Sequence, residues 1–306
     1  MPTMGIIHSG SKDNQDQEKQ IATLILHLEG EGYVHGQDGF SISGPHWAHD
    51  DPAKLRSYAE HLVQQGVNVL VAAGGSISSQ VAKEATQNSG TPVVFTSAAH
   101  PVSPAPNMTG VCARTTELDP TRLTLLHELV PAAKKVGALV NSARPQPDTK
   151  ALDDAAAMLG LQPLDYKDVR NGHHHGGDPD KIKQAFHDWA AAGIKAALVT
   201  ANPFFNNHRR KVVDAARHAK IPAIYQWREF VDAGGLMSYG PKLSEAYKLA
   251  ALYVARILRK QQHHQPKDLP VALLSKFELV INLSTAKELG VAVPETLRAR
   301  ADDLVV

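Results

Sequence analysis

The clearest indication of the fold comes from residues 192–230, AGIKAALVTANPFFNNHRRKVVDAARHAKIPAIYQWREF. It reads as a glycine, an apolar strand, a turn, a polar helix, a residue followed by proline, a second apolar strand and a polar loop. The segment QGVNVLVAAGGSISSQVAKEATQNSGTPVVFTSAAHP, residues 65–101, has the same order. Short apolar runs that alternate with segments of helical period are typical of βα units and parallel sheets. The recurrence therefore predicts an α/β protein with two lobes, each a doubly wound, Rossmann-like sheet.

Size and composition exclude several classes of protein. The chain has 306 residues, enough for two domains with separate cores. Its 43% hydrophobic and 21% charged residues are typical of a globular protein. The formal net charge is +1, and the basic residues are spread along the chain, so we expect no nucleic-acid partner. No apolar run approaches the roughly 20 residues that a membrane-spanning helix needs.

The first residues, MPTMGIIHSGSKDN, contain no basic region, long apolar stretch or cleavage site of the kind found in secretory signals. This predicts either a cytoplasmic protein or a mature form from which an export signal has been removed. The sequence leaves both possibilities open.

The ends of the predicted strands give the first candidate binding residues, because ligands of doubly wound sheets bind beyond the carboxyl ends of the strands. Ser9 and Ser11 follow the first strand. In AAGGSISSQ, glycines and serines lie between a strand and a helix, where N–H groups and hydroxyls suit an anion such as a carboxylate. A tight turn with a serine cap is the alternative. The candidates in this turn are Gly75, Ser76, Ser78 and Ser79.

A third strand, PVVFTSA, ends in a proline-rich loop. Thr96, Ser97 and Ala98 at its end are further candidates for hydrogen bonds to a ligand, although loop packing explains them equally well. None of these turns is a G-x-G-x-x-G or Walker sequence, which argues against a nucleotide ligand.

Aromatic residues gather in the second copy of the repeat. Phe204, Phe205 and Trp227 follow two predicted strands of the same lobe, in a chain that is only 6% aromatic. A flat ligand or a cation stacks well on such rings. Ordinary core packing is the alternative reading.

Signals for a metal, a cofactor or catalysis are weak. The three histidines at 173–175 lie in an extended polar loop, where they cannot all converge on one ion, and His263 and His264 lie in a polar linker. We find no G-x-S-x-G or H-E-x-x-H sequence and no nucleophile with an evident base. Asp51, Asp119 and Asp178 each precede a proline and are expected to cap helices. The sequence thus predicts no enzyme, no cofactor and no metal site.

Two late segments carry a resemblance to a known family. NPFFNNHRRKVVDAARHAKIPAIYQWREFVDAGGLMSYGP, residues 202–241, resembles the signature region of the ABC transporter substrate-binding family that includes tryptophan- and tyrosine-binding lipoproteins. KFELVINLSTAKELGVAVPETLRARAD, residues 276–302, resembles that family's C-terminal segment. NMTGVCA and PVVFTSAAHPV agree more loosely, so the resemblance covers most of residues 65–302.

The resemblance implies a type I periplasmic binding protein fold, with two lobes joined by a hinge of three crossings and a ligand trapped between them. The crossings are expected near 113–119, 236–242 and 272–279. The implied lobes are residues 1–115 with 242–274, and residues 116–241 with 275–306.

By position, the resemblance also implies ligand-binding residues in both lobes. Ser76, Ser78 and Ser79 are expected to bind a ligand carboxylate, with Thr96 and Ser97 beside them. The other lobe and its hinge are expected to contribute Asn141, Phe204, Phe205, Trp227 and Tyr239, and Asn202 is a further candidate because it follows the end of a predicted strand.

The implied function is solute capture for an ABC importer. The partners are a small amino-acid-like or aromatic carboxylate ligand, a permease and its ATPase, and the implied location is the periplasm or cell surface. Two alternatives stay open at this point: a cytoplasmic small-molecule sensor of the same fold, and an α/β enzyme of transferase type that uses the same cleft.

Overall fold

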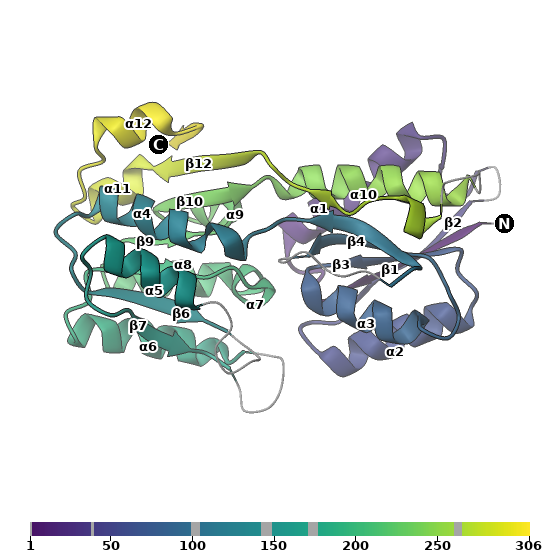
Figure 1. Ribbon diagram of the computed structural model, residues 1–306, viewed down its shortest axis with the longest axis horizontal. Helices are drawn as coiled ribbons and strands as arrows, with labels where there is room; N and C mark the ends of the chain where they lie inside the picture. Colours follow the sequence, from purple (N-terminus) through teal and green to yellow (C-terminus); the bar gives the residue numbers. More distant parts are fainter. Residues whose placement is uncertain (1, 38–39, 99–104, 142–148, 171–176, 260–264) are drawn as a thin grey trace. The chain divides into compact units, whose positions relative to one another are not determined.

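The computed structural model describes residues 2–37, 40–98, 105–141, 149–170, 177–259 and 265–306 (Figure 1). The chain divides into two compact units, Met1–Arg114 with Leu243–Ser275 and Thr115–Lys242 with Lys276–Val306. It therefore passes between the units three times. The expectation of an α/β fold with two mostly parallel sheets is confirmed.

Unit 1 is built on a six-stranded sheet in the order β11-β5-β4-β3-β1-β2, in which every described pair is parallel. Helices α1 and α10 pack on each other on one face, and α2 and α3 on the other (Figure 1). Its elements are β1 Thr3–His8, α1 Gln15–Gly30, β2 Ser41–Trp47, α2 Pro52–Gln64, β3 Val69–Ala73, α3 Ser76–Thr86, β4 Val93–Ala98, β5 Met108–Cys112, α10 Leu243–Leu258, η2 Pro266–Asp268 and β11 Ala272–Leu273.

Unit 2 has a seven-stranded sheet in the order β13-β12-β10-β9-β8-β6-β7, with β10 and β12 as its antiparallel pair. Helices α4 and α5 pack together on one face, and α6 and α8 on the other. Its elements are η1 Thr116–Leu118, α4 Asp119–Leu129, β6 Val136–Val140, α5 Thr149–Met158, β7 Asp165–Asp168, α6 Pro179–Ala191, β8 Ala196–Val199, α7 Pro203–Asn207, α8 Arg209–His218, β9 Ala223–Tyr225, α9 Arg228–Asp232, β10 Met237–Pro241, β12 Phe277–Asn282, α11 Leu283–Glu288, α12 Glu295–Arg300 and β13 Asp303–Val305.

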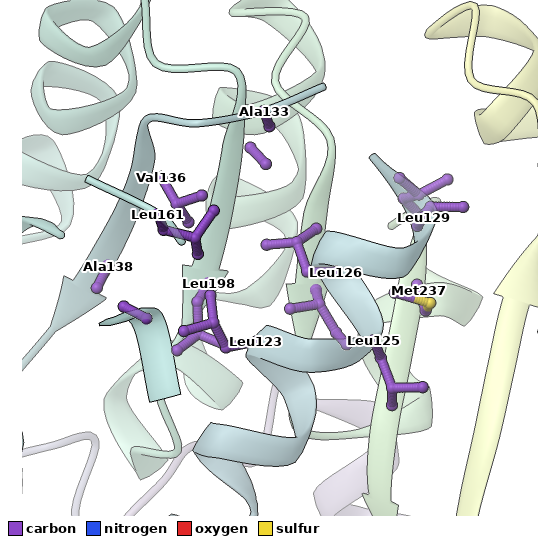
Figure 2. Close-up of a cluster of buried hydrophobic side chains, with 14 of the residues drawn as sticks. Leu123, Leu125, Leu126, Leu129, Ala133, Val136, Ala138, Leu161, Leu198 and Met237 are labelled. Atoms are coloured by element: carbon purple, nitrogen blue, oxygen red, sulfur yellow. The ribbon is translucent and has the colours of Figure 1, made fainter. Parts of the chain in front are cut away.

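The core of unit 2 shows why the central strands read as continuous apolar runs. Leucines of α4 pack against β8 and β10. Leu123 lies near Leu198 of β8, and Leu129 lies nearer to Met237 of β10 (Figure 2). Helices cover both faces of this sheet, so its central strands place apolar side chains on both sides. The loops that leave the sheet at the carboxyl ends of these strands therefore start from a packed core.

Two of the three expected helix caps are confirmed. The Asp51 side chain accepts hydrogen bonds from the N–H groups of Ala53 and Lys54, and Asp178 accepts one from Asp180. The expectation for Asp119 is wrong. The short helix η1 runs directly into α4, so Asp119 lies inside the helix and its carboxylate instead pairs with Arg122, one turn further along.

None of the helices that the structure describes is both long and apolar enough to cross a lipid bilayer.

Candidate functional site

The first candidate region is the carboxyl edge of the unit 1 sheet, between β1 and β3. The helix that follows β1 packs on one face of the sheet, and the helix that follows β3 packs on the other. Such a divergence is the topological switch point, where ligands of doubly wound sheets bind. The Ser9 hydroxyl donates a hydrogen bond of 2.8 Å to the carbonyl oxygen of Gly74, which joins the two loops at this point.

Helix α3 begins at this switch point without a side-chain cap. Its cap residue is Gly75, with φ of 110°. Glycine is also needed at position 74, where φ is 89° and a Cβ atom would lie 2.5 Å from Ser9 Oγ. The backbone can therefore pass close to the β1 loop, and the positive end of the α3 dipole lies at the edge of the sheet.

The serines of α3 differ in what their hydroxyls do. Ser76 is half-buried, whereas Ser78 and Ser79 are buried. The Ser79 hydroxyl donates a long hydrogen bond of 3.4 Å to the Gly75 carbonyl oxygen, and Ser78 Oγ has no hydrogen-bond partner. Ser11 is engaged with its own loop, because its N–H donates to Gln17 and its hydroxyl to Asp13.

Strand β4 ends at the same edge. Thr96 is fully buried and its hydroxyl is unpaired, whereas Ser97 is half-buried. Ala98 is the last residue of β4 and lies opposite Cys112 of β5. The structure thus places the unit 1 candidates at the ends of three neighbouring strands, β1, β3 and β4.

Two residues of this edge were missed by the sequence reasoning. His8 ends β1 and Trp47 ends β2, and their ring centroids lie 4.4 Å apart. β2 contains Gly44 and Pro45, residues that are more typical of turns than of strand interiors. β2 continues to Trp47 because it is an edge strand, where a proline need not break a ladder of hydrogen bonds.

Unit 2 has a comparable switch point between β6 and β8. Asn141 follows β6, and Asn202 follows the end of β8. The Asn202 amide nitrogen donates a 2.8 Å hydrogen bond to the Asn141 carbonyl oxygen, and its amide oxygen accepts from the N–H of Phe204. Asn202 therefore joins two loops and caps α7, so both ends of its amide take part in the fold.

The aromatic candidates are more buried than the wall of an open site would be. Phe205 is 0% exposed, Phe204 5% and Trp227 8%. Gly177 leaves room for Phe204, because a Cβ atom there would lie 2.5 Å from its ring. Tyr239 is half-buried, with its ring 6.0 Å from that of Phe277. Phe204, Phe205 and Trp227 follow the carboxyl ends of β8 and β9, whereas Tyr239 is the middle residue of β10, the strand next to β9.

Gln226, between β9 and Trp227, is a further polar residue at this edge, at the end of a strand where the sequence predicts ligand contacts. It is fully buried, and neither its amide nitrogen nor its amide oxygen has a hydrogen-bond partner. A buried amide of this kind is unusual, since most buried polar atoms are paired.

A buried ion pair supports this edge of unit 2. Arg122 is fully buried and donates to the carbonyl oxygens of Thr115 and Tyr239 and, at 2.5 Å, to the Asp119 carboxylate. Burial raises the pKa of Asp119 to about 6, although Arg122 and a hydrogen bond from the Ala201 backbone act in the opposite direction. The guanidinium group ties the start of unit 2 to the strand that precedes the second crossing.

No group of three or more His, Cys, Asp or Glu side chains among the described residues is arranged to hold a metal ion. The histidines at 173–175 and the pair His263 and His264 lie outside the described residues.

Comparisons with known proteins point in one direction. A family described as ABC transporter substrate binding protein matches residues 28–305. A search of curated proteins found no match. Among solved structures, an ABC domain in complex with L-Trp from Streptococcus pneumonia has a TM-score of 0.84 at 21% identity, and covers 99% of each chain.

Two other solved structures extend this likeness. A conserved domain protein from Vibrio cholerae has a TM-score of 0.83 at 22% identity, with 99% of each chain covered. An ABC transporter solute binding protein from Bacillus halodurans with bound myo-inositol has a TM-score of 0.63 at 11% identity, covering 97% of this chain and 96% of that chain. At these identities the likeness shows a shared fold.

Proposed function

The chain belongs to the ABC transporter substrate binding protein family, and we propose that it captures a small solute and delivers it to a membrane importer. Its α/β fold, with two largely parallel sheets, is that of the type I periplasmic binding proteins. The members of this family are substrate-binding proteins rather than enzymes. The chain accordingly performs no reaction of its own, and its partners are a permease and the ATPase that drives it.

The proposed ligand is an amino-acid-like or aromatic carboxylate. The observation that carries this assignment is the uncapped start of α3 at the unit 1 switch point, where Gly74 and Gly75 bring backbone N–H groups to the edge of the sheet. The N-terminus of a helix attracts a carboxylate through these N–H groups and the helix dipole. The bound L-Trp of the Streptococcus protein supports the class, although the Bacillus relative binds myo-inositol.

The proposed mechanism is capture by closure of the two units around the solute. Unit 1 supplies the donors at the ends of β1, β3 and β4, and unit 2 supplies Trp227 and Tyr239. The location proposed from the family is the periplasm or the cell surface, where such proteins meet their permease.

A thermal-shift screen tests this function. The panel consists of L-tryptophan, L-tyrosine, 4-hydroxybenzoate, adenosine, fructose and myo-inositol, applied to protein that has been unfolded and refolded to remove any co-purified solute. A ligand that binds only the native state raises the melting temperature, by an amount that grows with its concentration above Kd. We expect a shift with at least one of the three carboxylates. A protein that responds to no compound, while unfolding cooperatively, would contradict solute capture of these classes.

Trp227→Ala is expected to weaken binding of the carboxylate that gives the largest shift by about 1–3 kcal/mol, the scale of a stacked aromatic at an interface. Trp227→Phe keeps an aromatic face and should lose less. Isothermal titration measures both affinities, and the melting temperature without ligand checks the folding of each variant. Unchanged affinity in a folded Trp227→Ala protein would remove this residue from the site.

A further inference from the structure

His8 has one ring nitrogen that is committed to the fold and one that is not. The N–H of Gly10 donates a 2.9 Å hydrogen bond to Nδ1. Nδ1 therefore has no proton, and the proton of the neutral ring is on Nε2. Burial lowers the pKa of His8 to about 3, so the ring is neutral at physiological pH. Nε2–H is thus a buried donor, and it has no hydrogen-bond partner.

The neighbours of His8 on the sheet form one row at the carboxyl edge. In the strand register, His8 lies beside Trp47 of β2 on one side and Ala73 of β3 on the other. The β3–β4 register pairs Ala72 with Phe95, so the next position along brings Thr96 into the row. Thr96 is fully buried, and its hydroxyl is also unpaired.

In this row, Ala73 lies between His8 and Thr96, each of which has an unpaired polar atom. His8 and Thr96 are two strands apart, which corresponds to ~10 Å between their Cα atoms. The His8 ring leans toward the intervening strand, because a Cβ atom at Gly74 would lie 2.9 Å from its Cε1 and Nδ1 atoms. On the other side, the half-buried Trp47 ring stacks obliquely on the imidazole and reaches the surface.

We propose that His8 is a ligand-binding residue whose Nε2–H donates a hydrogen bond to a carboxylate oxygen of the solute, with Thr96, two strands away, as a second polar contact and Trp47 as the aromatic neighbour. This rests on the solute-capture function proposed above. A neutral N–H donor requires an acceptor, and buried donors without a partner are rare in native proteins. A carboxylate offers two acceptor oxygens, and a hydrogen bond to a charged acceptor is stronger than one to a neutral acceptor.

Two substitutions separate the role of Nε2 from that of Nδ1. His8→Asn places an amide oxygen near the position of Nδ1, so it can still accept from Gly10, but it has no donor at the position of Nε2. His8→Gln reaches that position with an amide nitrogen. The matched control is His46→Asn. His46 lies near the carboxyl end of β2 and also has an unpaired Nε2, but its ring packs on Tyr58.

Isothermal titration with L-tryptophan, L-tyrosine and 4-hydroxybenzoate provides the measurement. For the carboxylate that binds the wild-type protein most tightly, we expect His8→Asn to raise Kd about 10- to 100-fold, the effect of losing one hydrogen bond to a charged group. His8→Gln should stay within roughly threefold of wild type, and His46→Asn within roughly twofold.

The outcomes distinguish this proposal from the function on which it rests. Wild-type affinity in a folded His8→Asn protein overturns it, and so does equal weakening by His8→Asn and His46→Asn, which would be a general effect on unit 1. A wild-type protein that binds only fructose, myo-inositol or adenosine overturns the carboxylate assignment but leaves solute capture intact. A wild-type protein that binds no compound of the panel contradicts capture of these classes of solute, and the proposed role of His8 falls with it.

Discussion

Arg122→Met is expected to lower the free energy of unfolding by about 3–5 kcal/mol, the effect of removing one partner from a buried ion pair. Methionine replaces arginine with an unbranched apolar side chain, which leaves Asp119 buried without its guanidinium partner. It also removes the hydrogen bonds that Arg122 donates to the carbonyl oxygens of Thr115 and Tyr239. Urea denaturation followed by circular dichroism measures the change.

The reason for the loss can be tested with a second substitution. In the double variant Asp119→Asn/Arg122→Met, no buried charge is left unpaired, so much of the stability should return. The control is Arg217→Met, because the pair of Arg217 with Glu288 is about half exposed on both sides and should contribute less than about 1 kcal/mol. If Arg122→Met changes stability no more than Arg217→Met does, the buried pair is not a major support of unit 2.

The sequence predicts the fold because the fold depends on a pattern that recurs. Two segments with the same order of glycine, strand, turn, helix and strand indicate two sheets of one kind, and the parallel order of the strands follows from the helices between them. The same reasoning locates the carboxyl ends of the strands. Ser9 and Gly74, and likewise Asn141 and Asn202, do meet at switch points.

The chemistry at those edges depends on contacts that no local pattern contains. Asp119 precedes a proline, as many helix-capping residues do. Its partner in the structure is instead the buried guanidinium group of Arg122. His8 reads as the end of a strand, and only the register with Trp47 and Ala73 shows what surrounds it. Register and burial are tertiary properties, so the sequence locates the edge of each sheet without identifying which side chains remain unpaired there.

The aromatic residues after β8 pose the same question, because a ring at the end of a strand can belong to a site or to the core. Phe204 and Phe205 are in the short helix α7, and both are buried within the described structure. Their rings meet edge to face at a centroid distance of 5.7 Å, and Phe204 also contacts the ring of His208. The ligand contact of these rings stays a prediction. The alternative is a packing role, and its contribution to the free energy of unfolding can be measured.

Phe205→Ala is therefore expected to lower the free energy of unfolding by about 3–5 kcal/mol, the range for truncating a fully buried phenylalanine. The Phe205 side chain is 0% exposed, so its whole ring is buried. The expected loss of stability is therefore the free energy of transferring the ring from water to the interior plus the cost of the cavity that it leaves. Met158→Ala is the control within the same unit, because Met158 is 90% exposed and its truncation should change stability by less than about 0.5 kcal/mol. Urea denaturation measures both variants, and isothermal titration with L-tryptophan or 4-hydroxybenzoate is repeated on whichever remains folded. A Phe205→Ala protein that keeps its stability but loses affinity would show that this ring belongs to the ligand site instead of the core.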